Sequence, residues 1–251
     1  MSEPILLRRL DGPVARLTLN DPERANVLSE AMMAQLSQAL SELAADPAVR
    51  VLVLGAAGKV FCAGHDLGEL RTCGGEAASE ALFARCSTLM QAIVACPKPV
   101  IAQVQGAAVA AGCQLVASCD LAYSVDTARF AVSGINLGLF CSTPGVALAR
   151  AVGRKDALEM LLTGRFVGAA EAAAMGLINR AVPAAELDAV VDGAAQAIAA
   201  KAPDAIALGK SIFHRQIELP LVESYALASR AMAENLAFAS AEAGIDGFLK
   251  R

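Results

Sequence analysis

The stretch of residues 98–120, KPVIAQVQGAAVAAGCQLVASCD, constrains the fold more than any other part of the chain. Residues 99–104 are apolar and rich in β-branched side chains, which predicts a buried strand. Residues 105–112 are mostly small and predict a loop, and residues 113–118 predict a short helix. A strand that leads through such a loop into a helix leaves backbone N–H groups unpaired, and the helix dipole favours an anion there. Close packing alone also favours small residues, and both interpretations stay open.

The rest of the pattern predicts alternating strands and helices, as in an α/β protein. Residues 5–10 and 14–20 flank an Asp-Gly-Pro turn and predict a hairpin. Ser29 is expected to cap a helix. Residues 55–64 predict a loop, and no strong strand pattern follows residue 183. The other expected elements are helices over residues 29–44, 66–71, 77–95, 144–151, 155–162, 169–175, 187–200, 204–216, 221–239 and 241–250, and strands over residues 51–54, 121–125, 129–132, 135–137 and 178–182.

Charge and cysteine content argue against several classes of protein. The net charge of −4 gives no basic surface for nucleic acid. No apolar run reaches the roughly 18 residues that a membrane span needs. Seven cysteines, an odd number without a C-x-x-C pair, argue against a disulfide framework and favour a reduced cytosol. With only two histidines, His65 and His214, no metal site is expected. The sequence thus predicts a cytoplasmic protein without nucleic-acid or membrane partners.

Three motifs occur in the order found in one known family. They are residues 98–120, the segment KVFCAGHDLGEL at residues 59–70, and residues 162–179 with LTGR and AAMGLIN. Together they make nearly the whole chain similar to the enoyl-CoA hydratase/isomerase (crotonase) superfamily. The resemblance implies an α/β fold, a ClpP-like spiral of repeated ββα units, over residues 1–195 with an acyl-CoA site. It also implies a helical C-terminal oligomerisation region over residues 196–251, and a homotrimer or a dimer of trimers.

The resemblance implies that two backbone N–H groups stabilise the oxyanion of a thioester enolate. They fall on His65, directly after an Ala-Gly pair, and on Ala111, directly before a glycine. Ala110 and Ala111 stand where the family generally has glycine, so a Cβ there is expected to narrow the hole or to demand an ordinary φ angle. The imidazole of His65 could act as an acid or a base. Alternatively, only its backbone matters.

The two glutamates that family hydratases use align with Gln114 and Gly134. In hydration, such acids activate water and help to protonate the α-carbon. An amide cannot exchange a proton at neutral pH, and glycine has no side chain. Ordinary hydratase activity is therefore not expected, and glutamate at both positions is predicted to raise it. Asp66 is interpreted as a helix cap and Glu69 as a solvated residue, while Cys141 lacks a partner that would make it a nucleophile.

The resemblance also implies where coenzyme A binds. Its adenine would lie against the turn of Arg24, Ala25 and Asn26, where Arg24 meets a phosphate or is only a solvated charge. Because coenzyme A arrives as part of the acyl-CoA thioester, no separate cofactor is expected. The other expected contacts are Ala63, His65, Asp66, Leu67, Gly68 and Ala111.

A narrower resemblance comes from AAGCQLVASCD at residues 110–120 combined with GLFCSTPGVALARAV at residues 138–152. The pair is similar to the enoyl-CoA hydratase domain-containing protein 3 group, whose members share the missing acids. Three hypotheses follow: an acyl-CoA enzyme of the hydratase/isomerase type, a decarboxylase of malonyl-CoA-type substrates, or a non-catalytic acyl-CoA-binding or regulatory protein. Asp120, which ends the signature, is expected to accept structural hydrogen bonds.

Overall fold

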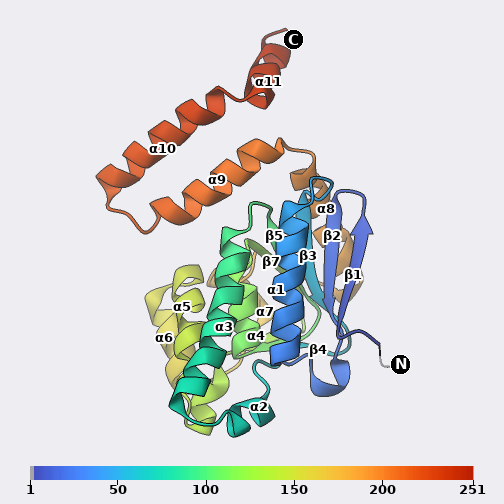
Figure 1. Ribbon diagram of the computed structural model, residues 1–251, viewed down its shortest axis with the longest axis vertical. Coiled ribbons are helices and arrows are strands. Elements are labelled where there is room, and N and C mark those ends of the chain that lie inside the picture. Colours follow the sequence, from blue (N-terminus) through green and yellow to red (C-terminus); the bar gives the residue numbers. More distant parts are fainter. Residues whose placement is uncertain (1–2, 251) are drawn as a thin grey trace.

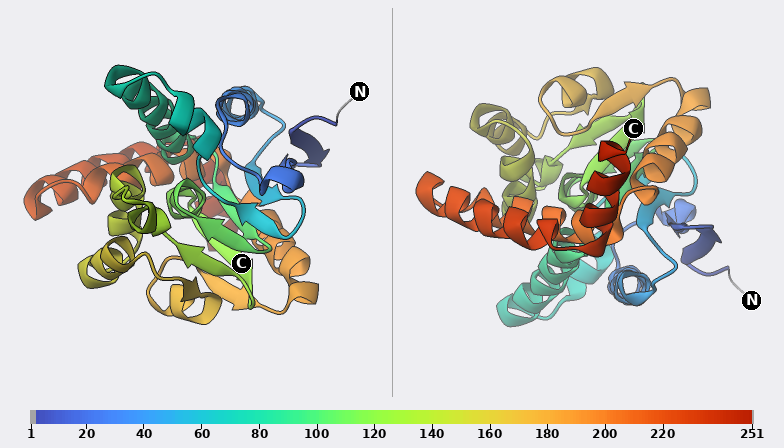
Figure 2. Two further views of the ribbon diagram at one scale, coloured as in Figure 1. Left: turned by 90° about the horizontal axis from the view of Figure 1, so that it is seen from below. Right: turned by 90° about the horizontal axis from the view of Figure 1, so that it is seen from above.

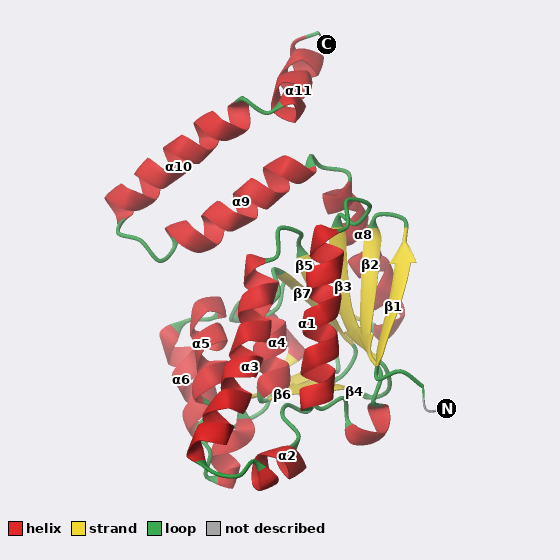
Figure 3. Ribbon diagram, in the orientation of Figure 1, coloured by secondary structure: helices red, strands yellow, loops and turns green. Residues whose placement is uncertain are grey.

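The computed structural model describes residues 3–250, and its largest element is a six-stranded sheet (Figure 1 and Figure 3). The predicted hairpin is confirmed, since the first two strands pair antiparallel with Leu6 opposite Leu19. The later neighbours in this sheet pair parallel. In spatial order the strands are β1 (Leu6–Asp11), β2 (Val14–Leu19), β3 (Val51–Ala56), β5 (Val100–Val104), β7 (Leu121–Val125) and β10 (Arg180–Val182).

A second, four-stranded sheet carries the segments around the predicted site. Its strands pair parallel except for the last pair, which is antiparallel. Two of these strands lie in residues 55–64 and 105–112, which were predicted as loops, so those predictions were wrong. Pairing between segments far apart in the sequence makes them strands, and a short local pattern does not reveal that. In spatial order they are β4 (Val60–Cys62), β6 (Ala107–Val109), β8 (Arg129–Ala131) and β9 (Val167–Gly168).

Helices cover both faces of the six-stranded sheet, with α1 in front of it and α8 behind it in Figure 3. This coverage explains why β3 and β5 read as continuous apolar runs. The predicted cap of α1 is confirmed, because Ser29 Oγ accepts the Met32 N–H at 3.2 Å. The helices are α1 (Glu30–Ala45), α2 (Leu67–Thr72), α3 (Glu76–Ala95), α4 (Ala111–Ser118), α5 (Ser142–Ala151), α6 (Arg154–Thr163), α7 (Ala169–Ala174), α8 (Leu187–Ala199), α9 (Pro203–Gln216), α10 (Leu221–Leu236) and α11 (Ala239–Leu249).

Two further predictions at the site are corrected. The helix expected to start at residue 113 already includes Ala111, because the Gln114 N–H donates to the Ala110 carbonyl at 3.0 Å. Residues 135–137, predicted as a strand, belong to the 3-10 turn Ser133–Leu137. Gly138 closes this turn at a φ of 78°, a left-handed conformation that glycine adopts without steric cost.

The last three helices form an arm that leaves the core after α8. Figure 1 shows α9 and α10 side by side with α11 beyond them, and Figure 2 shows α10 extending past the rest of the molecule. No residue of α9 or α11 is buried, whereas α8 packs against the strands β3, β5 and β7. The division of the chain near residue 195 stays a prediction. Within residues 3–250, no helix combines the length and apolar character that crossing a membrane requires.

Asp120 joins the core to the arm. Its Oδ2 accepts the Val100 N–H and the Lys210 ammonium, each at 2.7 Å. Lys210 on α9 also donates to the carbonyls of Ile93 and Lys98, at 3.0 and 3.1 Å. The expectation that Asp120 accepts structural hydrogen bonds is confirmed.

Candidate active site

Two glycines bring the predicted oxyanion segments into contact. A Cβ built on Gly64, which follows β4, would lie 2.9 Å from the Ala110 Cβ and 3.2 Å from the Ala111 nitrogen. A Cβ on Gly112, in the first turn of α4, would lie only 2.2 Å from the Cys62 carbonyl oxygen. Larger side chains at either position would therefore separate the end of β4 from the start of α4.

The N–H groups of His65 and Ala111 have no backbone acceptor within residues 3–250. His65 forms a parallel β-bridge with Leu28, whose N–H donates to the Gly64 carbonyl at 2.8 Å. Ala111 is the first residue of α4, where N–H groups lack partners inside the helix and the dipole favours negative charge. Both predicted oxyanion residues thus present a free donor beside the contact of β4 with α4.

Ala110 adopts a backbone conformation that alanine rarely takes. Its φ is 49° and its ψ is −117°, whereas Ala111 is helical. The conformation is held from both sides, because the Ala110 N–H donates to the Ala131 carbonyl at 2.8 Å and its own carbonyl accepts the Gln114 N–H. Such strain typically costs about 1–3 kcal/mol. The expected conflict between a Cβ and the glycine-like turn therefore falls on Ala110.

A cavity of about 440 Å³ lies at these donors. Of the sequence-predicted site residues, Ala63, His65, Leu67, Ala111 and Gly134 line it. Among residues 3–250, no Asp or Glu lines it, so these residues give its wall no carboxylate. Much of the rest of the wall is apolar and was not predicted from the sequence, for example Leu70, Phe83, Val109, Leu139 and Phe140.

Neither glutamate position supplies an acid to this cavity. Gln114 is 4% exposed and is not among the lining residues, and its Oε1 has no hydrogen-bond partner within residues 3–250. Gly134 lines the cavity, but a Cβ on it would lie 2.6 Å from the Leu139 carbonyl oxygen and 2.8 Å from the Cys141 Sγ. The backbone at Gly134 therefore leaves no room for a side chain without a shift of the following loop.

The ring nitrogens of His65, a residue that lines the cavity, are buried against the protein. Its ring packs edge-on against Phe83 of α3, with the ring centroids 5.4 Å apart. Within residues 3–250, neither ring nitrogen has a hydrogen-bond partner, although both are shielded from solvent. Burial lowers the pKa of this imidazole, and the nearby backbone of Leu28 opposes that shift only in part. The ring is therefore neutral at pH 7.

Cys141, the residue directly before α5, also lines the cavity. The side chain is buried, and its Sγ accepts the Gly134 N–H at 3.3 Å. Burial raises the pKa of this thiol. Because the thiolate is the reactive form, Cys141 is poorly suited to nucleophilic attack.

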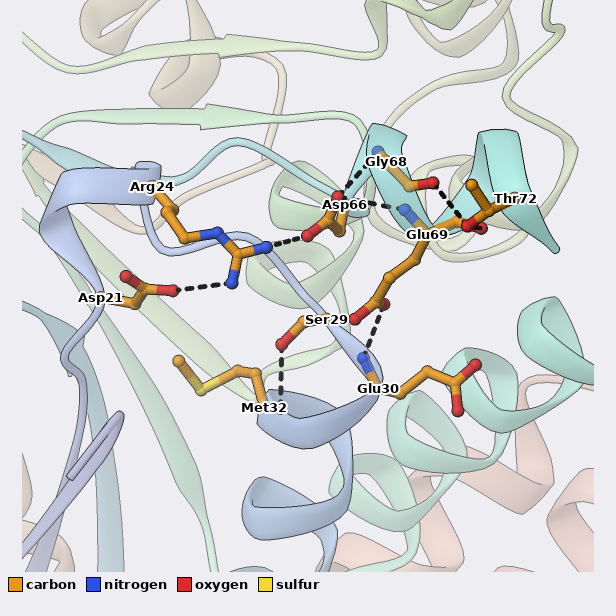
Figure 4. A network of polar contacts seen from close by, with 9 residues as sticks. All are labelled: Asp21, Arg24, Ser29, Glu30, Met32, Asp66, Gly68, Glu69 and Thr72. Atoms are coloured by element: carbon orange, nitrogen blue, oxygen red, sulfur yellow. Dashed lines mark hydrogen bonds and ion pairs between the residues drawn. The ribbon is translucent and has the colours of Figure 1, made fainter. Parts of the chain in front are cut away.

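An ion-pair network stands beside this cavity (Figure 4). Asp66 caps α2 as predicted, with its Oδ1 accepting the N–H groups of Gly68 and Glu69 at 2.7 and 3.2 Å. Its other oxygen pairs with Arg24, which also lies 3.5 Å from Asp21. Glu69 was predicted to be solvated, but its Oε2 accepts the backbone N–H that starts α1, at 2.9 Å.

The turn of Ala25 and Asn26 lies next to the first oxyanion segment, because the Ala25 carbonyl accepts the Ala63 N–H at 3.0 Å. Asn26 is fully buried, and its amide nitrogen donates to the carbonyls of Ala57 and Val60 at 2.8 and 2.7 Å. Its side chain therefore holds the loop before β4. Arg24, by contrast, is half-exposed, and its charge is paired with Asp66 and Asp21.

The chain has a crotonase fold, as predicted: two mostly parallel sheets are surrounded by helices and followed by a helical C-terminal part. The crystal structure of an enoyl-CoA hydratase from Mycobacterium smegmatis matches with a TM-score of 0.97 at 53% identity, covering 99% of this chain and 97% of that one. The structure of human enoyl-CoA hydratase domain-containing protein 3 matches with a TM-score of 0.96 at 43% identity, covering 98% of each chain.

Sequence comparison gives the family. The enoyl-CoA hydratase/isomerase family model matches residues 9–251. The mitochondrial enoyl-CoA hydratase domain-containing protein 3 of Xenopus laevis is 43% identical over 248 residues, which cover 99% of this chain and 84% of that protein. The chain therefore belongs to the enoyl-CoA hydratase/isomerase family and resembles its domain-containing protein 3 group.

The predicted cytoplasmic location is corrected by these comparisons. The relatives from Xenopus laevis, human and mouse are all named as mitochondrial proteins. The prediction rested on cysteine content, which reports on the redox state of a compartment and cannot distinguish between two reducing compartments.

Proposed function

We propose that this chain binds an acyl-CoA thioester and stabilises its enolate with the N–H groups of His65 and Ala111. The observation that carries the proposal is the pair of unpartnered donors at the wall of one cavity. Fixed donors aimed at a developing oxyanion typically contribute about 3 kcal/mol each, because they need no reorganisation during the reaction. Since both donors are backbone groups, alanine and histidine are acceptable at these positions.

The coenzyme A end of the substrate would follow the turn of Arg24, Ala25 and Asn26 and the segment from Ala63 through Asp66, Leu67 and Gly68. The backbone hydrogen bond from Ala63 to Ala25 supports this, because it holds the two segments side by side. Arg24 would exchange its carboxylate partners for a phosphate, which its planar guanidinium group can bind through two hydrogen bonds. No cofactor beyond the coenzyme A of the substrate is required.

Ordinary hydration is not part of the proposed activity. Gln114 and Gly134 provide no acid, and none of the described residues brings a carboxylate to the cavity. The same lack of carboxylates favours a second candidate reaction, the decarboxylation of a malonyl-CoA-type thioester. A substrate carboxylate would meet no like charge there, and loss of CO₂ leaves the enolate that the two donors stabilise.

Binding and turnover test these proposals separately. Calorimetry with acetoacetyl-CoA and with acetoacetate should give much tighter binding of the thioester, and equal affinity would contradict acyl-CoA recognition. Turnover of crotonyl-CoA should be far below that of a hydratase with both glutamates. Assays with a 3-enoyl-CoA and with methylmalonyl-CoA distinguish isomerisation from decarboxylation. Tight binding without turnover of any of them would make the protein a non-catalytic acyl-CoA binder.

We also propose that the chain assembles as a homotrimer or a dimer of trimers. Support comes from large apolar side chains on the C-terminal arm that are more than two-thirds exposed in a single chain. Such a surface is typical of a protein contact. Light scattering should give three or six times the mass of one chain, and a monomer at micromolar concentration would contradict the proposal. The exposed apolar side chains of the arm that support this assembly are Leu221, Val222, Tyr225, Met232 and Phe248.

A further inference from the structure

We propose that the acyl group bound at this site is an apolar chain of medium length, about eight to twelve carbons by volume, and that Phe83 sets the upper limit. The inference rests on the proposed binding of an acyl-CoA thioester and adds the class of acyl group. It concerns the part of the chain beyond the two oxyanion donors, and it is independent of which reaction follows.

The chemistry of the cavity wall is the first argument. Among residues 3–250, no Asp, Glu, Lys or Arg lines it, and the ring nitrogens of His65 are buried against the protein. Leu67 and Leu70 of α2 line it together with Leu139 and Phe140, which follow the 3-10 turn. A charged group at the end of an acyl chain would lose its hydration here without gaining a partner. A hydrocarbon chain leaves no polar group unpaired.

Four large apolar side chains at the cavity are also accessible to solvent. Leu67, Leu137, Leu139 and Phe140 are 58%, 66%, 52% and 46% exposed. Exposed apolar surface that gathers around a pocket is typical of a ligand-binding groove. A chain lying among these side chains would remove their surface from water. Each methylene group that becomes fully buried typically tightens binding about 4-fold.

The volume of the cavity indicates the length of the chain. About 440 Å³ is available. This corresponds to roughly 15 methylene groups, if each takes about the 30 Å³ of a water molecule in the liquid. A four-carbon acyl group would fill only about a quarter of that space. The thioester and the adjoining part of coenzyme A need some of it, which leaves room for about eight to twelve carbons.

Phe83 stands between this cavity and the surface of α3. Phe83 and Thr143 line the cavity and also line an open depression, whose other lining residues, Glu76 and Glu80 among them, all belong to α3. The two residues therefore form the partition between the two spaces. The edge-on contact with His65 holds the phenyl ring in place. A smaller side chain at position 83 would join the spaces and let a longer chain extend beyond the cavity.

The dependence of affinity on chain length tests the inference. Calorimetry is done with butyryl-, octanoyl-, dodecanoyl- and hexadecanoyl-CoA, each below the concentration at which it forms micelles. Affinity should rise at least about 10-fold from four to eight carbons, because the added methylenes become buried. From twelve to sixteen carbons it should change by less than about 2-fold, because the added methylenes find no further apolar wall.

Variants at position 83 test the limit. Phe83→Ala and Phe83→Leu should each gain at least about 4-fold in affinity between twelve and sixteen carbons, since the partition is shortened. Phe83→Leu keeps an apolar side chain in the fold and decides the matter if the alanine variant does not fold. Phe166→Ala is the matched control, because Phe166 lies under Arg129 and does not line the cavity. It should show the chain-length dependence of wild type.

A variant of the wall distinguishes binding in the cavity from unspecific adhesion of long chains. Leu139→Asn should weaken binding of octanoyl-CoA at least about 4-fold and change that of butyryl-CoA much less. Leu10→Asn, on β1 and outside the cavity, is the matched control, because Leu10 is 57% exposed and Leu139 is 52% exposed. It should bind both thioesters like wild type. Equal weakening in the two variants would overturn the inference.

The outcomes separate the inference from the function on which it rests. A wild type that binds none of the thioesters would overturn both. Butyryl-CoA bound as tightly as octanoyl-CoA would overturn only the proposed chain. A wild-type affinity that keeps rising up to sixteen carbons would overturn the limit at Phe83, as would a folded Phe83→Leu variant without the added gain.

Discussion

The Nζ of Lys210 lies 2.7 Å from Oδ2 of Asp120, so the first helix of the C-terminal arm is bound to the last residue of the signature stretch. The two side chains are 8% and 16% exposed. Removing one partner of an ion pair that is largely shielded from solvent leaves the other charge uncompensated, which in a fully buried pair typically costs about 3–5 kcal/mol. Lys210→Met should therefore lower the free energy of unfolding by about 3 kcal/mol. It should also speed hydrogen exchange in α9. Lys155→Met, at an exposed lysine of α6, is the control, and equal effects of the two would contradict the anchor.

Ala110→Gly should stabilise the protein. Glycine adopts the φ of 49° at this position without the clash of a Cβ, and relief of about 1–3 kcal/mol of strain exceeds its entropic cost of about 0.5–1 kcal/mol. Ala111→Gly, one residue further in a helical conformation, should destabilise by about 1 kcal/mol. Chemical denaturation of the two variants measures the difference. A loss of stability in Ala110→Gly would show that this residue is not strained.

Gly134→Ala should destabilise the protein by about 1–3 kcal/mol, because the new Cβ would overlap the Leu139 carbonyl and the Cys141 sulfur. The control is Gly193→Ala in α8, where a Cβ meets nothing within 4 Å and the change should stabilise by about 0.5–1 kcal/mol.

Because the backbone leaves no room for a side chain at position 134, Gln114→Glu with Gly134→Glu should not restore crotonyl-CoA hydration. The sequence alone had predicted that it would. A double variant that is both as stable as wild type and active would contradict this account.

The capping hydrogen bonds of Asp66 should stabilise α2 more than its ion pair with Arg24 does. Asp66→Ala removes the acceptor for the N–H groups of Gly68 and Glu69 and should cost about 1 kcal/mol. Asp66→Asn keeps a capping oxygen and loses only the pair with half-exposed Arg24, so its effect should be within about 0.5 kcal/mol, since exposed pairs contribute little. Thermal unfolding distinguishes the two. Equal losses would mean that the charge matters more than the cap.

Cysteine reactivity should follow burial. Desolvation raises the pKa of Cys62 and of Cys113 to about 12, whereas the side chain of Cys73 is only half-buried. With a thiol reagent at pH 8, Cys73 should react first, and Cys73→Ser should abolish that phase. Cys62 and Cys113 should react only after unfolding, and rapid labelling of either in the folded protein, read by peptide mass spectrometry, would contradict their burial.

The same two thiols predict a loss of stability in alkali. The folded chain keeps their protons up to about pH 12, whereas in the unfolded chain they are lost around the ordinary value of 9.0. Above pH 9 the unfolded state therefore binds fewer protons, and the free energy of unfolding falls as the pH rises. Cys62→Ala combined with Cys113→Ala should flatten this slope in denaturation curves between pH 9 and 10.5.

Local sequence determined the features that depend on neighbouring residues. The hairpin of β1 and β2, the cap of Ser29 on α1 and the cap of Asp66 on α2 follow from residue type and spacing, and all three were predicted correctly. The absence of both hydratase acids is likewise a property of the sequence, because no fold can give Gly134 a side chain or make Gln114 exchange a proton.

Only the tertiary structure decided how the site is built. The approach of Gly64 to Ala110, the strands β4 and β6, and the contact of Phe83 with His65 join segments that are far apart in the chain. Local pattern holds no information about such pairs, because each is made by packing between elements that the sequence describes one at a time. The same packing put the strain on Ala110 and closed the space at Gly134.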